Sequence, residues 1–176
     1  DHIERSNLSR SVLFRAEDEG REKATVACES MHVLNPDEAL KTHAFCDNII
    51  HGMGLGVFYW ADVVIGGLDN REARLFVSQG CALAGRLWVD GAIEALDGIV
   101  RVFDPARGAC YECTMNKTDR QQVADRRSCA MVARHVVAQG HVPTTAVTAS
   151  MVGAYQVQEA IKILHNQPGL RGEGVH

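Results

Sequence analysis

The stretch ADVVIGGLDN at residues 61–70 constrains the fold of this chain more than any other feature. Val63, Val64 and Ile65 form a continuous apolar run, which is typical of a buried parallel strand. Gly66-Gly67 then permits a sharp turn or a close approach of the backbone to a ligand. Asp69 follows beyond the carboxyl end of the strand, where open α/β sheets bind ligands. The stretch therefore predicts an α/β domain with a functional carboxylate, although Asp69 would also suit the N-cap of the next helix.

The flanking segments fit a mixed, mostly parallel sheet flanked by helices. The expected helices cover residues 12–33, 71–85 and 143–164, after a polar loop over residues 1–10. The expected strands are Leu40–Cys46, Val63–Ile65, Leu87–Val89 and Ile99–Phe103. We expect the last strand to pair antiparallel, because only a short loop containing Gly98 separates it from the preceding segment. At least one βαβ unit follows from this order.

The glycine-rich stretch HGMGLGVFYW at residues 51–60 does not fit a dinucleotide-binding loop. That fingerprint follows a strand, opens a helix and places its third glycine three residues after the second. Here the glycines are Gly52, Gly54 and Gly56, and an aromatic run leads into the next strand. We expect a surface loop or a short helix.

Length and charge narrow the class of protein. The chain has 176 residues, enough for one core, and a formal net charge of −4 gives no reason to expect binding to nucleic acid or acidic membranes. No apolar run approaches the roughly 20 residues of a spanning helix, and no signal peptide opens the chain. We expect a reducing cytoplasm, with Cys28, Cys46 and Cys81 as reduced core residues. Because the chain begins with Asp1 rather than Met, we expect it to be trimmed or cut from a longer polypeptide.

Five motifs occur in a characteristic order along the chain. They are DHIERSNLSR (1–10), DEGREK (18–23), DVVIGGLDNREAR (62–74), CYEC (110–113) and QVQEAIK (156–162). In this order they resemble the adenylation domain of ubiquitin-activating enzymes and their ThiF, MoeB and HesA relatives. The resemblance implies one Rossmann-like domain over residues 1–176, incomplete at both ends, with a crossover segment at about 114–142. The glycine-rich phosphate loop of the family would lie upstream of Asp1.

The resemblance also implies a nucleotide site. These enzymes bind ATP and magnesium and join AMP to the C-terminal glycine of a ubiquitin-like protein. Asp1 matches the acceptor for the ribose hydroxyl, Arg10 and Lys23 match phosphate contacts, and Asn7 is a polar contact nearby. One departure is Ser11, which follows Arg10 where the family usually has glutamine.

The resemblance assigns the strand-end carboxylate as well. Asp69 matches the magnesium ligand of the family, and Asn70 beside it belongs to the same cofactor-binding motif. The position of Asp69 just beyond a strand agrees with that role independently of the resemblance.

The stretch CYECTMNKTDRQQVADRRSC at residues 110–129 concentrates cysteines. The resemblance implies that Cys110 and Cys113 are half of a structural zinc site, because zinc needs four ligands. The partner pair would lie beyond His176; His135 and His141 are substitutes, each expected to be a surface histidine instead. The alternative is a reduced pair that packs a turn.

Cys129 has a different implied role. In the ubiquitin-activating branch a cysteine of the crossover segment attacks the acyl-adenylate and carries the modifier as a thioester, at about this distance from the C-x-x-C pair. A nucleophilic cysteine needs thiolate character, and positive charge nearby favours it. That charge would come from Arg126, Arg127 and Arg134, with the dipole of a helix beginning near Ser128. The alternative is an ordinary thiol.

Three functions stay open at this point. The first is an activating enzyme that adenylates a ubiquitin-like modifier and then forms a thioester on Cys129, with a conjugating enzyme as a further partner. The second is an adenylyltransferase for a sulfur-carrier protein of thiamin or molybdopterin synthesis, without a thioester. The third is a non-catalytic partner subunit. The family implies a homodimer or pseudo-dimer, and the chain alone, without a phosphate loop, is expected to be inactive.

Overall fold

A three-stranded mixed sheet forms the centre of the molecule. The computed structural model describes residues 1–94, 96–127 and 145–165. Strand β1 (Val63–Gly66) pairs in parallel with β2 (Leu87–Glu94), and β2 pairs antiparallel with β3 (Asp97–Phe103). The order β1-β2-β3 confirms the predicted α/β class, the parallel pair and the antiparallel last strand.

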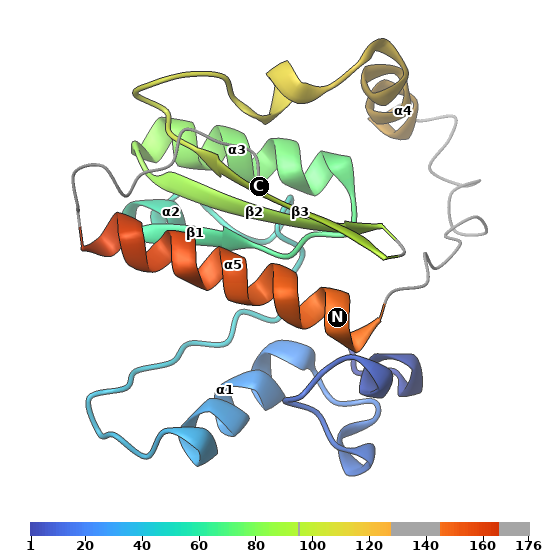
Figure 1. Ribbon diagram of the computed structural model, residues 1–176, viewed down its shortest axis with the longest axis vertical. Helices are drawn as coiled ribbons and strands as arrows, with labels where there is room; N and C mark the ends of the chain where they lie inside the picture. Colours follow the sequence, from blue (N-terminus) through green and yellow to red (C-terminus); the bar gives the residue numbers. More distant parts are fainter. Residues whose placement is uncertain (95, 128–144, 166–176) are drawn as a thin grey trace.

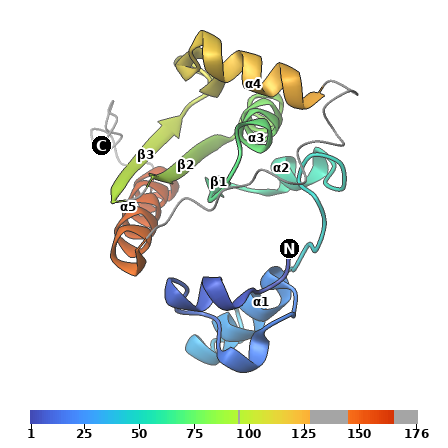
Figure 2. The ribbon, with the colours of Figure 1, turned by 90° about the vertical axis from the view of Figure 1, so that its right-hand side faces the viewer.

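Helices cover both faces of this sheet, as Figure 1 shows. Helix α3 (Arg71–Ala84) lies on one face, and α5 (Ala146–Leu164) lies on the other. Helix α4 (Lys117–Arg127) lies beyond α3, away from the sheet (Figure 2). The remaining helices are α1 (Lys23–Leu34), α2 (Gly56–Trp60), η1 (Arg5–Ser9), η2 (Ala16–Asp18) and η3 (Tyr111–Thr114), the η helices being of the 3₁₀ type.

The core has one part on each face of the sheet. The α3 side holds an aromatic-rich cluster that includes Phe58, Trp88, Phe103 and Tyr111. The α5 side holds a smaller aliphatic cluster of Val89, Val100, Val152 and Ile163. The sheet is therefore covered on both faces, as parallel strands require.

The expected helix over residues 12–33 is wrong in its first half, because α1 begins only at Lys23. The preceding residues fold into a separate turn, in which the Arg15 backbone N–H donates to Asp18 Oδ2 at 2.8 Å. Gly20 follows with a φ of 86°, in the left-handed region that interrupts a helix. The predicted end is confirmed, since α1 stops at Leu34 before Asn35-Pro36.

The expected strand Leu40–Cys46 is also wrong. These residues have no regular secondary structure. A strand needs a neighbour to receive its backbone hydrogen bonds, and none of the described strands lies beside this segment. Strand β1 is also less buried than expected. It pairs only with β2 among the described strands, and Ile65 is 48% exposed.

The other elements agree with the sequence, except for the length of the β2–β3 hairpin and one unexpected helix. The β2–β3 hairpin is longer than expected, and Gly98 lies inside it opposite Ile93 rather than in the loop. Residues 51–60 contain the short helix α2, as one of the two expected forms. The polar run after Cys113 contains α4, which was not expected. Its start is stabilised by a reciprocal pair, because the backbone N–H of Asn116 donates to the Asp119 carboxylate and that of Asp119 donates to the Asn116 side chain.

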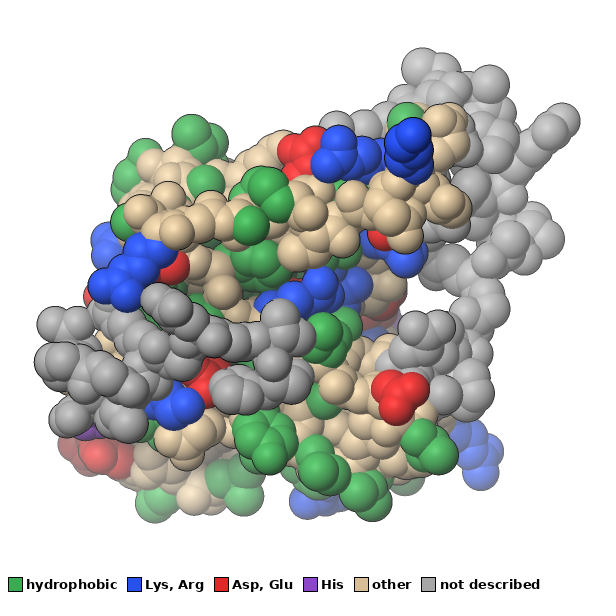
Figure 3. All heavy atoms as spheres, turned by 45° about the horizontal axis from the view of Figure 1, so that its top comes forward, with side chains coloured by type: hydrophobic (Ala, Val, Ile, Leu, Met, Phe, Trp, Pro, Cys, Tyr) green, Lys and Arg blue, Asp and Glu red, His purple; other side chains and the backbone are tan. Residues whose placement is uncertain are grey.

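Helix α5 begins after Thr145, whose side chain accepts from the Thr148 backbone N–H. Its predicted end at Leu164 is confirmed, whereas the predicted start at Pro143 lies outside the described residues. Large hydrophobic residues remain exposed along this helix: Val147, Met151, Tyr155, Val157, Ile161 and Leu164. Figure 3 shows hydrophobic side chains along the lower edge of this view. None of the described helices has both the length and the apolar composition of a membrane span.

Candidate functional site

Asp69 lies in the turn between β1 and α3, where the sequence placed it. Its carboxylate is exposed, and Oδ1 accepts a hydrogen bond from Asn70 Nδ2 at 2.9 Å. Asn70, not Asp69, is the N-cap of α3, because Asn70 Oδ1 accepts from the Ala73 backbone N–H at 2.8 Å. The start of α3 is thus capped by Asn70, and the Asp69 carboxylate remains accessible to a ligand.

The residues at this turn fit a magnesium ion bound together with a nucleotide. Mg²⁺ is usually held by one or two carboxylates plus substrate phosphates and water, not by an all-protein cage. Asp69 supplies one exposed carboxylate. Among the described residues, no three acidic, histidine or cysteine side chains cluster as a metal site of their own.

The other predicted nucleotide contacts lie in the N-terminal segment. Lys23 Nζ forms an ion pair with Asp1 Oδ2 at 2.7 Å. The Arg10 guanidinium donates to the Ser6 carbonyl at 2.9 Å. Asn7 is buried, and its side-chain oxygen accepts from the Glu4 backbone N–H at 3.0 Å. Asn7 therefore shapes the turn from which Arg10 projects.

These two groups of residues belong to different parts of the fold, the first to the N-terminal segment and the second to the β1–α3 turn. Within the described residues, no hydrogen bond or ion pair joins Asp1, Asn7, Arg10 or Lys23 to Asp69. Figures 1 and 2 show the N-terminal segment with α1 as a lobe below the sheet layer. The structure brings Asp1 and Lys23 together and leaves Asp69 at the sheet.

A buried charge network next to Asp69 was not expected from the sequence. Asp90 in β2 has no exposed surface, and its Oδ1 lies 3.1 Å from Arg74 Nε. Its Oδ2 lies 3.6 Å from Arg101 Nη2. Burial raises the pKa of Asp90 above its ordinary value of 3.8, while the two arginines oppose that shift. An aspartate in the middle of the strand sequence LWVDGAIE was the signal, because a buried carboxylate needs cationic or hydrogen-bonding partners.

Gln156 of α5 was also missed as an individual residue, although its motif was noted. Its side chain is buried and donates to the carbonyls of Gly66 and Val89, the latter at 3.2 Å. These carbonyls belong to β1 and β2. Gln156 therefore joins the end of β1 to the next strand from the α5 side.

Cys110 and Cys113 lie on the turn that contains η3, with their sulfurs 3.8 Å apart. Both are exposed and free. Two thiolates of a tetrahedral zinc site with Zn–S bonds of about 2.3 Å are also about 3.8 Å apart. Burial raises the pKa of Cys110, but hydrogen bonds from Cys113 and from the Glu112 backbone outweigh it, so the pKa is lowered overall. This pair fits half of a zinc site, and among the described residues nothing supplies the other half.

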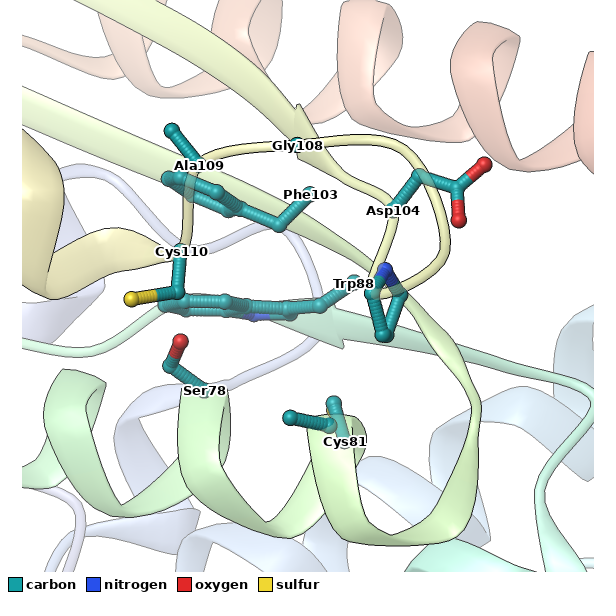
Figure 4. Close-up of a pocket in the computed structure, with 10 residues that line it drawn as sticks. Ser78, Cys81, Trp88, Phe103, Asp104, Gly108, Ala109 and Cys110 are labelled. Carbon is teal, nitrogen blue, oxygen red and sulfur yellow. The ribbon is translucent and has the colours of Figure 1, made fainter.

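The turn is anchored beside a cavity of about 90 Å³ between α3 and the Cys110 loop. Figure 4 shows the Trp88 and Phe103 rings lying one above the other, with Ser78 and Cys81 of α3 beneath them. Tyr111 packs edge-on against both rings, and its backbone N–H donates to Ser78 Oγ at 3.3 Å. The aromatic core thus holds the cysteine turn in place.

The remaining cysteine predictions have mixed outcomes. Cys81 is a buried core residue as expected, whereas Cys28 is only partly buried and Cys46 is exposed, so the expectation of three core cysteines is wrong. All three are free thiols, as expected. Cys129, His135, His141, Ser128 and Arg134 lie outside the described residues, as do the side chains of Arg126 and Arg127.

Comparison with known proteins gives consistent matches. The chain is 28% identical to ubiquitin-like modifier-activating enzyme 5 of Dictyostelium discoideum, over 93% of this chain and 44% of that protein. It is 31% identical to the sulfur carrier protein adenylyltransferase of Thermus thermophilus, over 93% of this chain and 57% of that protein. The chain therefore spans about half the length of the curated relatives it matches.

A solved structure gives the same fold. The crystal structure of E. coli MccB with ATP superposes with a TM-score of 0.71, at 19% identity, over 100% of this chain and 53% of that one. The fold is a Rossmann-like α/β domain, in which Asp69 lies exposed just beyond the carboxyl end of β1. The ThiF family model matches residues 1–174, and the chain belongs to the ThiF family.

Proposed function

We propose that this chain is the adenylation domain of an enzyme that uses ATP and Mg²⁺ to activate the C-terminus of a ubiquitin-like or sulfur-carrier protein. The observation that carries the proposal is Asp69, an exposed carboxylate beyond β1 in a ThiF-family chain. The relatives, named as activating enzymes or adenylyltransferases, support this reaction class. The proposal treats residues 1–176 as one domain whose crossover segment covers about 114–142.

The reaction joins a protein carboxylate to a phosphate. A carboxylate oxygen of the carrier C-terminus forms a bond to the α-phosphorus of ATP, and the bond from that phosphorus to the pyrophosphate oxygen breaks. Bound Mg²⁺ would neutralise phosphate charge, held on the protein side by Asp69. Arg10 and Lys23 would contact phosphate oxygens, and Asp1 would accept from the ribose hydroxyl. Since Lys23 is paired with Asp1, nucleotide binding would have to redistribute that ion pair.

Pyrophosphate exchange in the full-length protein tests this proposal. Adding a carrier protein, ATP, Mg²⁺ and labelled pyrophosphate should produce labelled ATP. We expect Asp69→Asn to reduce the exchange rate by about 100-fold or more, because a group that stabilises transition-state charge contributes on that order. The control is Asp62→Asn, the same change at an exposed aspartate just before β1. Exchange unaffected by Asp69→Asn would refute the role of Asp69.

The second step of the proposal is a thioester on Cys129, 16 positions after Cys113. The thiolate would attack the acyl carbon of the adenylate, and AMP would leave. We expect a thiol-sensitive adduct between the full-length protein and a ubiquitin-like modifier. Cys129→Ala should abolish the adduct and leave pyrophosphate exchange intact. The adduct would then be passed to a conjugating enzyme in the cytoplasm.

Two other outcomes would select the alternatives. Exchange with no adduct would indicate a sulfur-carrier adenylyltransferase, the function named for the Thermus thermophilus relative. ATP binding and exchange both absent, with dimerisation intact, would indicate a non-catalytic partner subunit. Size measurement of the full-length protein would test the expected homodimer or pseudo-dimer.

Zinc at Cys110 and Cys113 is a separate part of the proposal. The 3.8 Å sulfur separation supports it. Two further ligands are needed, from residues outside the described part of the chain or outside this sequence. We expect one zinc per full-length chain by elemental analysis, lost in a Cys110→Ser, Cys113→Ser double variant. Metal content unchanged by that double variant would exclude these two ligands.

A further inference from the structure

The turn that carries Asp69 is held by a buried arginine. Arg74, in the first turns of α3, is only 9% exposed. Its Nη2 donates to the carbonyl of Leu68, the residue before Asp69, and to the carbonyl of Gly91 at 3.3 Å. Its Nε donates to Asp90 Oδ1 at 3.1 Å. Because a guanidinium is planar with donors in fixed directions, three acceptors together fix the position of Leu68 relative to β2.

The partner of Arg74 connects the same turn to β3. Asp90 Oδ2 is buried and accepts no hydrogen bond within the described residues, and the buried Arg101 Nε donates none. The contact between Asp90 Oδ2 and Arg101 Nη2, at 3.6 Å, is therefore purely ionic. Arg101 in turn lies over the Tyr111 ring at 5.6 Å and donates to Thr114 Oγ1 at 3.4 Å. Tyr111 and Thr114 belong to η3, which also contains Cys113. A continuous series of charged and polar contacts therefore runs from the cysteine turn to Leu68.

The other end of the Asp69 turn is fixed from the opposite face of the sheet. Gln156 donates to the Gly66 carbonyl, two residues before Leu68. A Cβ placed on Gly91 would lie 2.5 Å from the Gln156 side chain, so glycine at this position leaves room for that contact. The segment Gly66–Leu68 is thus held at one end by Gln156 and at the other by Arg74.

We propose that Arg74 is the positioning residue for Asp69, and that Asp90 and Arg101 link this turn to the Cys110–Cys113 turn. The contacts of Arg74 are to Leu68, Asp90 and Gly91, so it would act on Asp69 indirectly, by fixing the backbone before it. The inference rests on the proposed role of Asp69 in holding the metal with ATP. It predicts that changes in this network alter metal affinity rather than carrier-protein recognition.

The test measures metal binding as well as activity in the full-length protein. Mn²⁺, a paramagnetic substitute for Mg²⁺, is titrated with ATP present, and bound Mn²⁺ is read from its electron paramagnetic resonance signal. Arg74→Lys retains the positive charge. A single ammonium group, however, cannot reproduce the planar set of guanidinium donors that reaches three acceptors. We expect Mn²⁺ affinity to fall about tenfold, with a lower kcat for exchange and an unchanged KM for the carrier protein.

The matched control is Arg71→Lys. Arg71 lies on the same helix, is about half exposed and pairs with Asp119 at 2.9 Å, an ion pair that lysine can replace. We expect its Mn²⁺ affinity to stay within twofold of the wild type. A purely structural role for Arg74 would lower the melting temperature without changing Mn²⁺ affinity at a temperature where the variant is folded, and that result would overturn the inference.

A second variant covers the case in which Arg74→Lys does not fold. The Arg101 side chain is 21% exposed, so Arg101→Lys should be better tolerated than Arg74→Lys. It changes the position of the second positive charge beside Asp90. Weaker Mn²⁺ binding in this variant supports the network, and unchanged binding overturns it. If the wild type binds Mn²⁺ and ATP without pyrophosphate exchange, the adenylation proposal fails while the affinity comparison still decides the role of Arg74. If the wild type binds no Mn²⁺ with ATP, both proposals fail.

Discussion

The cysteine side chains of the described residues differ sharply in environment. Cys81 is 2% exposed in the aromatic core, and burial raises its pKa to about 12. Cys110 is exposed, and its pKa is lowered from 9.0 by the hydrogen bonds described above. Since the thiolate is the reactive form, these two cysteines should behave in opposite ways.

Alkylation of metal-free protein with iodoacetamide at pH 8, followed by peptide mass spectrometry, checks this difference. We expect Cys81 to remain unmodified in the folded protein and Cys110 to react, with a rate that is half-maximal below pH 9. Denatured protein, in which every cysteine is accessible, provides the control. Modification of folded Cys81 at the rate of exposed Cys46 would contradict the buried position.

Asp90 should give stability a characteristic pH dependence. Its pKa is raised by burial, against the opposing charges of Arg74 and Arg101, so the folded state binds the proton more tightly than the unfolded state does. Stability therefore falls as pH rises from the ordinary value of 3.8 through the raised folded value, and it is constant below both.

The Asp90→Asn variant lacks this titration and is the matched comparison. We expect the free energy of unfolding of the wild type, relative to Asp90→Asn, to decrease over that pH window and then level off. Urea unfolding at a series of pH values measures the difference. A difference that increases with pH would mean that the arginines outweigh burial and that the pKa is lowered.

At the scale of single elements, two helices depend on side-chain caps. Asn70 caps α3 and Thr145 caps α5, each by accepting from a backbone N–H three residues on. We expect Asn70→Ala and Thr145→Ala each to lower the free energy of unfolding by about 1 kcal/mol. Only Asn70 also donates to Asp69, so only its loss should weaken Mn²⁺ binding.

Chemical denaturation and Mn²⁺ titration of both variants test this distinction in parallel. Asn70→Asp is a useful third variant, because it retains a capping oxygen but loses the donor to Asp69. Equal Mn²⁺ affinity in Asn70→Ala and Thr145→Ala would show that the contact with Asp69 has no role in metal binding.

At the scale of the whole molecule, Trp88 joins the main parts of the fold. Its ring has no exposed surface, stacks on Phe103 at 5.0 Å and contacts Tyr111 of the cysteine turn. We expect Trp88→Ala to cost about 3–5 kcal/mol of folding free energy, through lost burial and the cavity left behind. Trp60, 71% exposed, is the control, and Trp60→Ala should change stability by no more than about 0.5 kcal/mol.

Thermal unfolding followed by circular dichroism would resolve an effect of this size. The loss in Trp88→Ala should appear as one cooperative shift, because the ring contacts both the sheet and η3. A separate early transition limited to part of the signal would mean that the cysteine turn unfolds independently of the sheet.

The sequence alone determined the elements whose signals are local. The apolar run Val63–Ile65, the turn glycines and the capping position before REAR predict β1 and α3, and Asp69 follows at the strand end because backbone direction places it there. The motif order also determined the family. Local pattern sufficed because each of these features depends on residues within a few positions of one another.

Only the tertiary structure decided the rest, because it depends on partners distant in sequence. Leu40–Cys46 has strand-like residues but no neighbouring strand among those described, so it forms none. Asp90 and Arg74 are 16 positions apart, and Gln156 is 90 positions from Gly66; no local pattern predicts that these side chains hold one turn. The sequence thus placed the carboxylate of Asp69 at the sheet edge, and the fold determined what holds it there.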